Sequence, residues 1–254
     1  MLALLNILPL VFLTLVGLCV GSFCNVLILR IPRGEEFVKT PSHCFSCGHD
    51  LSWYENIPLL SWLMQGGKCR HCKAPISKQY PIVEALNGAA WLLCGMLFRD
   101  EPVRMALYCA LSSVLLVIAV IDWRTFLIPN GLNLTVFLLG CVQLLADLSH
   151  WKSYLIGMVS VSGFFLLLHI LTGGAGLGMG DVKLMFGAGL LLGGGRILLA
   201  MFLGSFAGSV IHTIRMKGGA GKKLAFGPYL AFGIWASALF GAKFIDFYLG
   251  LFGL

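Results

Sequence analysis

Charged residues are scarce in this chain. Asp, Glu, Lys and Arg make up 11% of its 254 residues, whereas soluble domains carry about 25%. This scarcity argues against a water-soluble enzyme, and the 58% of hydrophobic residues argues against intrinsic disorder. The sequence also lacks the alternation of apolar and polar residues that is typical of membrane β-barrels. It therefore predicts an all-α membrane protein that crosses the bilayer several times.

Long runs of apolar residues make up most of the chain. A bilayer-spanning helix needs about 20 apolar residues, and eight runs approach or reach that length, which predicts about eight transmembrane helices. They lie at 8–29, 83–98, 104–121, 129–147, 153–172, 184–195, 197–214 and 229–250. The run 184–195 is short and rich in glycine, and because small residues let helices approach closely, we expect a short buried helix there. The first run lacks the basic start and the small-residue cleavage site of a signal peptide, so we interpret it as a retained helix.

The net charge of +7 would suit a nucleic-acid-binding protein, but the basic residues are distributed as membrane topology predicts. If the polar block 30–82 faces the cytoplasm, thirteen basic residues lie on that side and four on the other. The thirteen are Arg30, Arg33, Lys39, Lys68, Arg70, Lys73, Lys78, Arg124, Lys183, Arg215, Lys217, Lys222 and Lys223. The four are Arg99, Arg104, Lys152 and Arg196. This predicts a cytoplasmic block, both termini outside, a lipid bilayer as partner and no nucleic acid.

The polar block contains two Cys-x-x-Cys pairs. Their members are Cys44, Cys47, Cys69 and Cys72. Because disulfides are rare on the reducing side of the membrane and zinc prefers four tetrahedral ligands, the pairs predict a structural, zinc-ribbon-like site. Four free thiols are the alternative, and His43 or His71 could replace one ligand. The segment 53–63 between the pairs is too apolar for a free loop, so we expect it to pack on the membrane surface or on the helix bundle.

We accordingly divide the chain into three parts. Residues 1–29 form the first transmembrane helix, and residues 30–82 form the small cytoplasmic four-cysteine domain. Residues 83–254 form a transmembrane part with seven helices. A block of about 50 residues buries too little apolar surface to fold by itself, which is the physical reason for a metal in the second part.

Two acidic residues lie directly beside apolar runs. Asp122 ends the run 104–121, and Asp181 follows Gly178 and Gly180 just before the run 184–195. An acid at the edge of a bilayer is costly and usually functional. The predicted topology puts both acids on the cytoplasmic side, where two neighbouring carboxylates could share a proton. The ionised member could then activate water while the neutral member polarises a carbonyl, and the glycines would leave room for an extended peptide.

Spacing alone leaves other interpretations open. Asp122 could pair with Arg124, and Asp181 could be a helix N-cap. Lys183 could anchor a helix at the interface or pair with a carboxylate. Glu84, just inside a span, could reach the interface or help to place a substrate. A proton-relaying transporter, or a membrane-anchored zinc module that only binds partners, would also contain such residues.

Eight stretches spread over nearly the whole chain resemble a known family, the bacterial prepilin peptidases. They are 41–42, 56–62, 67–72, 80–84, 121–122, 128–130, 178–183 and 226–228. Gly-x-Gly-Asp at 178–181 is a weak pattern alone, but it is specific together with the spaced cysteines and the first aspartate. The resemblance implies an eight-helix, GxGD-type aspartic protease of the bacterial inner membrane, with Asp122 and Asp181 as the catalytic pair.

The same resemblance implies the substrate and a second activity. The substrates would be prepilins or pseudopilins of type IV pilus or type II secretion systems, with a short basic leader before a hydrophobic helix. Cleavage would follow a glycine at the cytoplasmic face. Many members also methylate the new amino terminus with S-adenosylmethionine, for which the residues give no separate argument. Some members lack the four cysteines, so we expect the zinc to be auxiliary to proteolysis.

Overall fold

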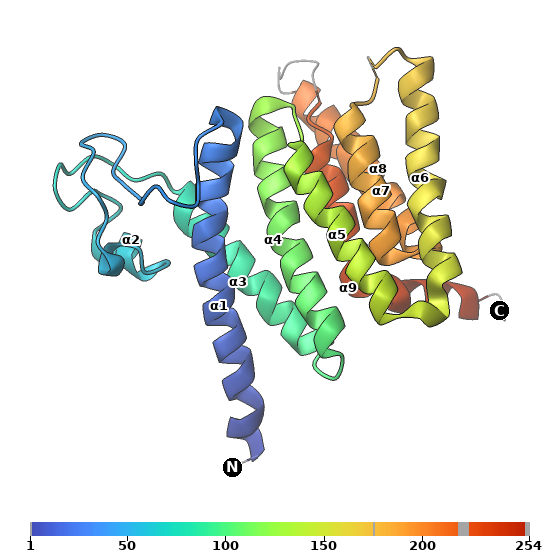
Figure 1. The fold of residues 1–254 in the computed structure, drawn as a ribbon, viewed down its shortest axis with the longest axis horizontal. Helices are drawn as coiled ribbons and strands as arrows, with labels where there is room; N and C mark the ends of the chain where they lie inside the picture. The colour runs from blue at the N-terminus through green and yellow to red at the C-terminus, as the bar shows by residue number, and fades with distance from the viewer. Residues whose placement is uncertain (1, 175, 218–223, 252–254) are drawn as a thin grey trace. The chain divides into compact units, whose positions relative to one another are not determined.

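The computed structural model describes residues 2–174, 176–217 and 224–251, and these residues form helices and no β-strand (Figure 1). Lys222 and Lys223, which we assigned to the cytoplasmic side, lie outside the described residues. The α-helices are α1 (Leu2–Arg30), α2 (Leu60–Met64), α3 (Gln79–Leu97), α4 (Pro102–Thr125), α5 (Asn130–Ala146), α6 (Trp151–Leu171), α7 (Met179–Leu192), α8 (Gly194–Lys217) and α9 (Gly227–Gly250). Short 3₁₀ turns are η1 (Ile31–Arg33), η2 (Trp53–Glu55) and η3 (Leu148–His150).

Each of the eight apolar runs coincides with one helix, so the prediction of an all-α membrane protein is confirmed. Among the described residues, six helices are long and apolar enough to cross a bilayer: α1, α3, α4, α6, α8 and α9. Helix α5 has 17 residues and α7 has 14, which is short for a spanning helix. The predicted start of α7 at residue 184 is wrong, because the helix begins at Met179 and contains Asp181 in its first turn.

The chain forms two compact units, Met1–Met105 and Ala106–Leu254. In the first unit α1 packs closely along α3. A Cβ atom on Gly21 would lie 2.8 Å from the Cα atom of Glu84, so only glycine allows this approach. The Asn87 side chain donates to the Gly17 carbonyl at 2.7 Å, and the Asn25 side chain donates to the Tyr80 carbonyl at 3.2 Å. These bonds fix the register of the two membrane helices.

In the second unit α7 is the central helix and packs against α5, α6, α8 and α9 (Figure 1). The expectation of a short buried helix here is confirmed. A Cβ atom on Gly187 would lie 2.8 Å from the backbone nitrogen of Phe137 in α5. A Cβ atom on Gly189 would lie 2.1 Å from the carbonyl oxygen of Gly157 in α6. Glycine at these positions lets three backbones touch, which holds the second half of α7 against α5 and α6.

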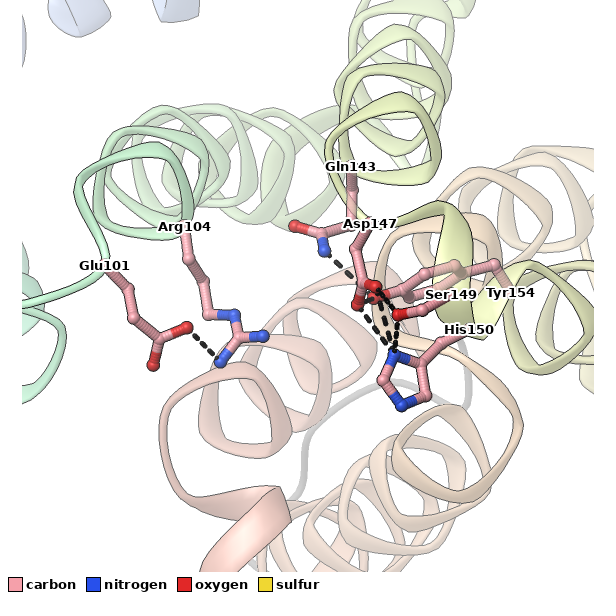
Figure 2. Close-up of polar contacts among 7 residues, drawn as sticks. All are labelled: Glu101, Arg104, Gln143, Asp147, Ser149, His150 and Tyr154. Atoms are coloured by element: carbon pink, nitrogen blue, oxygen red, sulfur yellow. Dashed lines mark hydrogen bonds and ion pairs between the residues drawn. The ribbon is translucent and has the colours of Figure 1, made fainter.

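A polar cluster closes the turn between α5 and α6 (Figure 2). The carboxylate of Asp147 accepts hydrogen bonds from the hydroxyls of Ser149 and Tyr154, and the Nδ1 atom of His150 lies 3.0 Å from it. Tyr154 in turn accepts a hydrogen bond from the Gln143 side chain at 3.0 Å. The Ser149 hydroxyl, followed by His150 and Tyr154, holds the pKa of the Asp147 carboxyl well below its usual range. The cluster therefore ties the end of α5 to the start of α6 through an ionised acid.

Candidate active site and metal centre

Asp122 lies in the last turn of α4 and is buried, with 5% of its surface exposed. Its Oδ2 atom accepts a hydrogen bond from the backbone N–H of Gly227 at 2.9 Å. Gly227 is the first residue of α9, where backbone N–H groups have no partner within the helix, and Pro228 follows it. The N-terminus of α9 therefore faces a carboxylate, an arrangement that the helix dipole stabilises.

Asp181 lies in the first turn of α7 and is also buried, with 8% of its surface exposed. The N-cap of this helix is Gly178, so the interpretation of Asp181 as an N-cap is wrong. The Gly178 carbonyl accepts the N–H of Asp181 at 3.2 Å, and the Gly178 backbone donates to the Asp181 carboxylate. This reciprocal pair resembles a capping box, in which an acid at the third helical position reaches back to the cap.

The fold brings Asp122 and Asp181 together from two helices. The charge of Asp122 acts directly on Asp181, so the two carboxylates lie within electrostatic reach of each other. Two like charges in a buried site repel strongly, and a shared proton relieves that repulsion. Each acid also lies at a helix N-terminus, Asp122 at α9 and Asp181 at α7. The pair can thus carry one negative charge and one proton without a metal ion.

The backbone before Asp181 is held by neighbouring side chains. A Cβ atom on Gly180 would lie 3.0 Å from the Cβ atom of Ile128, so a larger residue would push this turn away. The Asn133 side chain in α5 donates to the Gly180 carbonyl at 3.3 Å. Lys183 donates from Nζ to the Asn130 side chain at 2.8 Å. Lys183 therefore attaches α7 to the start of α5, a contact that neither interpretation drawn from the sequence had included.

Two residues near the pair were missed by sequence reasoning. The first is Gly227, whose role depends on its backbone and on a contact with a distant helix. The signal that could have found it is Gly227-Pro228, because proline is common in the first turn of a helix, where backbone N–H groups have no partner within the helix. The second is Asn133, which carries no signal in its own stretch of sequence. It is buried, and its Oδ1 atom has no hydrogen-bond partner among the described residues.

The four cysteines predicted as ligands come together. Their sulfur atoms all lie within 4.8 Å of one another, and the cluster contains no histidine among the described residues. The sulfurs of Cys44 and Cys72 are 3.8 Å apart. Zinc–sulfur bonds of about 2.3 Å in a tetrahedron would separate neighbouring sulfurs by about 3.8 Å. The donor set therefore fits a four-coordinate zinc ion.

The two cysteine pairs are built as equivalent turns. The N–H of Cys44 donates to the His49 carbonyl at 2.9 Å, and the N–H of Cys69 donates to the Ala74 carbonyl at 2.8 Å. Four residues after each first cysteine the backbone has a positive φ, at Gly48 (71°) and Lys73 (60°).

Backbone N–H groups in the first turn point at a sulfur. Those of Ser46 and then Cys47 donate to the Cys44 sulfur and lower the pKa of its thiol to about 6. The thiolate is the form that binds metals, so the first turn is prepared for a cation.

Glu84 lies in the other unit, in the second turn of α3, and it is buried. Its Oε2 atom accepts a hydrogen bond from the N–H of Leu59 at 2.8 Å. Leu59 has a φ of 59°, a backbone conformation that is unfavourable for a bulky side chain. The hydrogen bond to Glu84 therefore helps to hold Leu59 in this strained conformation. Glu84 thus fixes the polar block to a membrane helix, and a contact with substrate stays a prediction.

Known proteins are similar to this chain over most of its length. Residues 15–98 match the model of the bacterial peptidase A24 N-terminal domain, and residues 109–213 match that of the type IV leader peptidase family. A protein from Stutzerimonas stutzeri named prepilin leader peptidase/N-methyltransferase is 34% identical over 92% of this chain and 91% of its own length. A protein of the same name from Pseudomonas aeruginosa is 34% identical over 94% of this chain and 93% of its own length. No solved structure matches the chain significantly.

Proposed function

The chain belongs to the type IV leader peptidase family, and we propose that Asp122 and Asp181 are the catalytic pair with which it removes the leader of prepilins or pseudopilins. The observation that carries this assignment is the approach of two buried carboxylates from different helices. Burying acids near a bilayer is costly, so two of them that meet in one site call for a chemical role.

In the proposed mechanism the pair holds one proton. The ionised carboxylate takes a proton from a water molecule, and the water oxygen attacks the carbon of the scissile carbonyl. The neutral carboxyl donates its proton to the carbonyl oxygen, which forms a neutral tetrahedral intermediate. Collapse of the intermediate breaks the C–N bond. The leaving nitrogen takes the proton that the first carboxyl had accepted from water, and one hydroxyl of the intermediate returns its proton to the second carboxylate as the new carbonyl forms. Each acid then has the protonation state with which it began, ready for the next turnover.

The surroundings of the pair suit an extended peptide. Gly178 and Gly180 add no side chain to the turn in front of Asp181. The free Oδ1 atom of Asn133 is a buried acceptor, and leaving such a group without a partner costs about 1–3 kcal/mol. We propose that a backbone N–H of the substrate, or a water molecule that it displaces, supplies that partner. Asn133 would then bind the peptide beside the scissile bond.

We propose that the site faces the cytoplasm and that both termini are periplasmic. The excess of basic residues on one side supports this orientation in the bacterial inner membrane. The proposed division keeps residues 30–82 as a cytoplasmic domain between the first membrane helix, 1–29, and the peptidase part, 83–254. A prepilin would reach the site by its own hydrophobic helix, with the basic leader on the cytoplasmic side.

We propose that the four cysteines hold a structural zinc ion. Four thiolates complete its coordination and leave no open position for substrate. Bound zinc would hold the two turns of the polar block together, and the aspartates would carry out proteolysis. For the N-methyltransferase activity named in the relatives, the methyl donor that the family implies is S-adenosylmethionine.

The test is mass spectrometry of a prepilin's amino terminus before and after exposure to the purified protein in liposomes. We expect the basic leader to be lost at a single bond after a glycine. With S-adenosylmethionine present, we expect the new amino terminus to gain one methyl group. An unchanged prepilin under conditions where the protein is folded would contradict the peptidase, and would favour a transporter or a partner-binding module.

A further inference from the structure

Helix α2 has an apolar face that the described residues of its own unit leave exposed. Leu60, Leu63 and Met64 lie three and four residues apart, so they share one side of the helix. Their exposed fractions are 54%, 65% and 81%, and that of Trp53 in the preceding turn is 80%. We infer that these residues dock on anionic lipid at the membrane surface that borders the α1–α3 loop.

The opposite side of α2 is packed, so the exposed face is a defined surface. The Ser61 hydroxyl donates to the Tyr54 carbonyl at 2.7 Å, which attaches α2 to the turn η2. The Trp62 indole donates to the Ile76 carbonyl at 3.3 Å, and its ring lies against Gly67. These contacts turn Ser61 and Trp62 inward and leave Leu60, Leu63 and Met64 outside.

The attachment of α2 sets its depth relative to the bilayer. Leu59, directly before α2, is bonded to Glu84 of α3. Glu84 lies five residues into α3, which corresponds to about 8 Å along the helix axis. Gln79 and Tyr80 at the start of α3 are bonded to Asn25 of α1. Since α1 and α3 are both candidate membrane spans, we infer that α2 begins near the level where these helices enter the lipid.

Charge favours anionic lipid over a neutral surface. Within residues 51–78 the acidic residue is Glu55, which is buried. The basic residues of this stretch are exposed: Lys68, Arg70, Lys73 and Lys78. The Arg70 guanidinium lies 5.5 Å from the Tyr54 ring, and Tyr54 contacts Trp53 edge to face at 5.8 Å. Aromatic rings beside cations are typical of a membrane interface, where rings lie at headgroup level and cations meet phosphate.

Photocrosslinking tests the contact in the full chain. A benzophenone amino acid replaces Met64, the most exposed residue of the face, and in a matched control it replaces the inward-facing Trp62. Both proteins are placed in nanodiscs of phosphatidylcholine and phosphatidylglycerol, and bound zinc checks that the polar block is folded. We expect lipid adducts at position 64 and few at 62. Crosslinks from 64 to the same chain, to a second copy or to an added prepilin, or no adduct, would overturn the inference.

Hydrogen exchange tests the preference for anionic lipid. We expect the amides of residues 60–66 to exchange more slowly in nanodiscs with phosphatidylglycerol than with phosphatidylcholine alone. The difference should disappear when Lys68 and Arg70 are both changed to Gln, and persist in the control Lys39→Gln. Equal exchange in the two lipids for the unmodified protein would overturn the anionic part of the inference. Neither readout depends on leader removal, so failure here is distinguishable from failure of the proposed function.

Discussion

Asp122 is held by a backbone group from a helix far along the chain. The N–H of Gly227 donates to its Oδ2 atom at 2.9 Å, in the first turn of α9. A side chain at position 227 has no room, because a Cβ atom there would lie 2.7 Å from the same oxygen. At the scale of single residues, the position of the Asp122 carboxylate thus depends on Gly227, a residue without a reactive side chain.

We therefore predict that Gly227→Ala lowers the rate of leader removal by about a hundredfold, because a shift of about 1 Å in a catalytic group has an effect of that size. Alanine must displace either the Asp122 carboxylate or the start of α9. The rate is measured on a purified prepilin at saturating concentration. Thermal unfolding in detergent, run in parallel, checks that the variant remains folded.

Gly131→Ala is the matched control, since a Cβ atom at Gly131 would meet nothing within 4 Å. It should cleave at the normal rate. Normal cleavage by Gly227→Ala as well would show that the hydrogen bond to Asp122 does not position the acid.

Sequence alone could identify Asp122 and Asp181, because an acid beside a long apolar run is conspicuous in a chain with so few charges. Gly227-Pro228 marks a helix start, but sequence alone could not show that Gly227 meets Asp122, and it gave no signal for Asn133. Their contributions arise from contacts between helices, Gly227 with Asp122 and Asn133 with Gly180, and no local pattern encodes such contacts. The burial and backbone bond of Glu84 could not be foreseen for the same reason.

The turn between α5 and α6 is short, and an acid organises it. Asp147 accepts hydrogen bonds from Ser149 and Tyr154 and lies beside His150. These partners lower the pKa of its carboxyl, so the acid is ionised in the folded protein at any ordinary pH. At the scale of the element, the cluster fixes the angle at which α6 leaves α5, and α6 packs on the central helix α7.

We predict that Asp147→Asn lowers the unfolding temperature at pH 7. Because the folded pKa lies below the unfolded value of about 3.9, the carboxylate stabilises the fold above about pH 4. That contribution is lost as the pH falls through the folded pKa. The difference between variant and wild type should therefore shrink as the pH drops below 4, a trend that unfolding scans at several pH values would record. Asp100→Asn, at an exposed acid, is the control and should leave the unfolding temperature unchanged at every pH. A difference between Asp147→Asn and wild type that stays constant at all pH values would be evidence against this role of the carboxylate.

Most helices could be predicted as elements, because an apolar run long enough to span a bilayer has few other stable forms. The start of α7 could not. Met179, Gly180 and Asp181 interrupt the apolar pattern, yet Gly178 caps the helix in front of them. The cap brings Asp181 into the first turn, where backbone N–H groups and the helix dipole support its charge. The helix start that was predicted wrongly is thus the place where the candidate site lies. Such errors are expected at functional sites, where residues are not chosen for local secondary-structure preference.

At the scale of the whole molecule, a polar block with four cysteines interrupts the series of membrane helices. The described residues of the block contain no disulfide, since Cys44, Cys47, Cys69 and Cys72 are all free thiols. The four sulfurs of Cys44, Cys47, Cys69 and Cys72 converge within 4.8 Å. The general architecture could be predicted from apolar runs and Cys-x-x-Cys spacing. The bonds that fix the block to α3 could not, because they depend on a strained backbone at Leu59.

We predict about one zinc ion per chain in protein purified under reducing conditions, as four thiolates require. Changing Cys44 and Cys47 to Ser together should abolish zinc binding, measured by elemental analysis, because two ligands cannot hold the ion. Cys19→Ser, in the membrane helix α1, should keep it. Zinc retained in the double variant, or absent from the wild type, would contradict a structural metal centre.

The central claim is that Asp122 and Asp181 act as one catalytic unit. The most direct measurement is the rate of leader removal by wild type, Asp122→Asn, Asp181→Asn and the double variant, each reconstituted at equal concentration and shown to be folded. The account predicts that each single variant falls to background and that the double variant falls no further, as expected of groups that act together. Substantial cleavage by either folded single variant would contradict it.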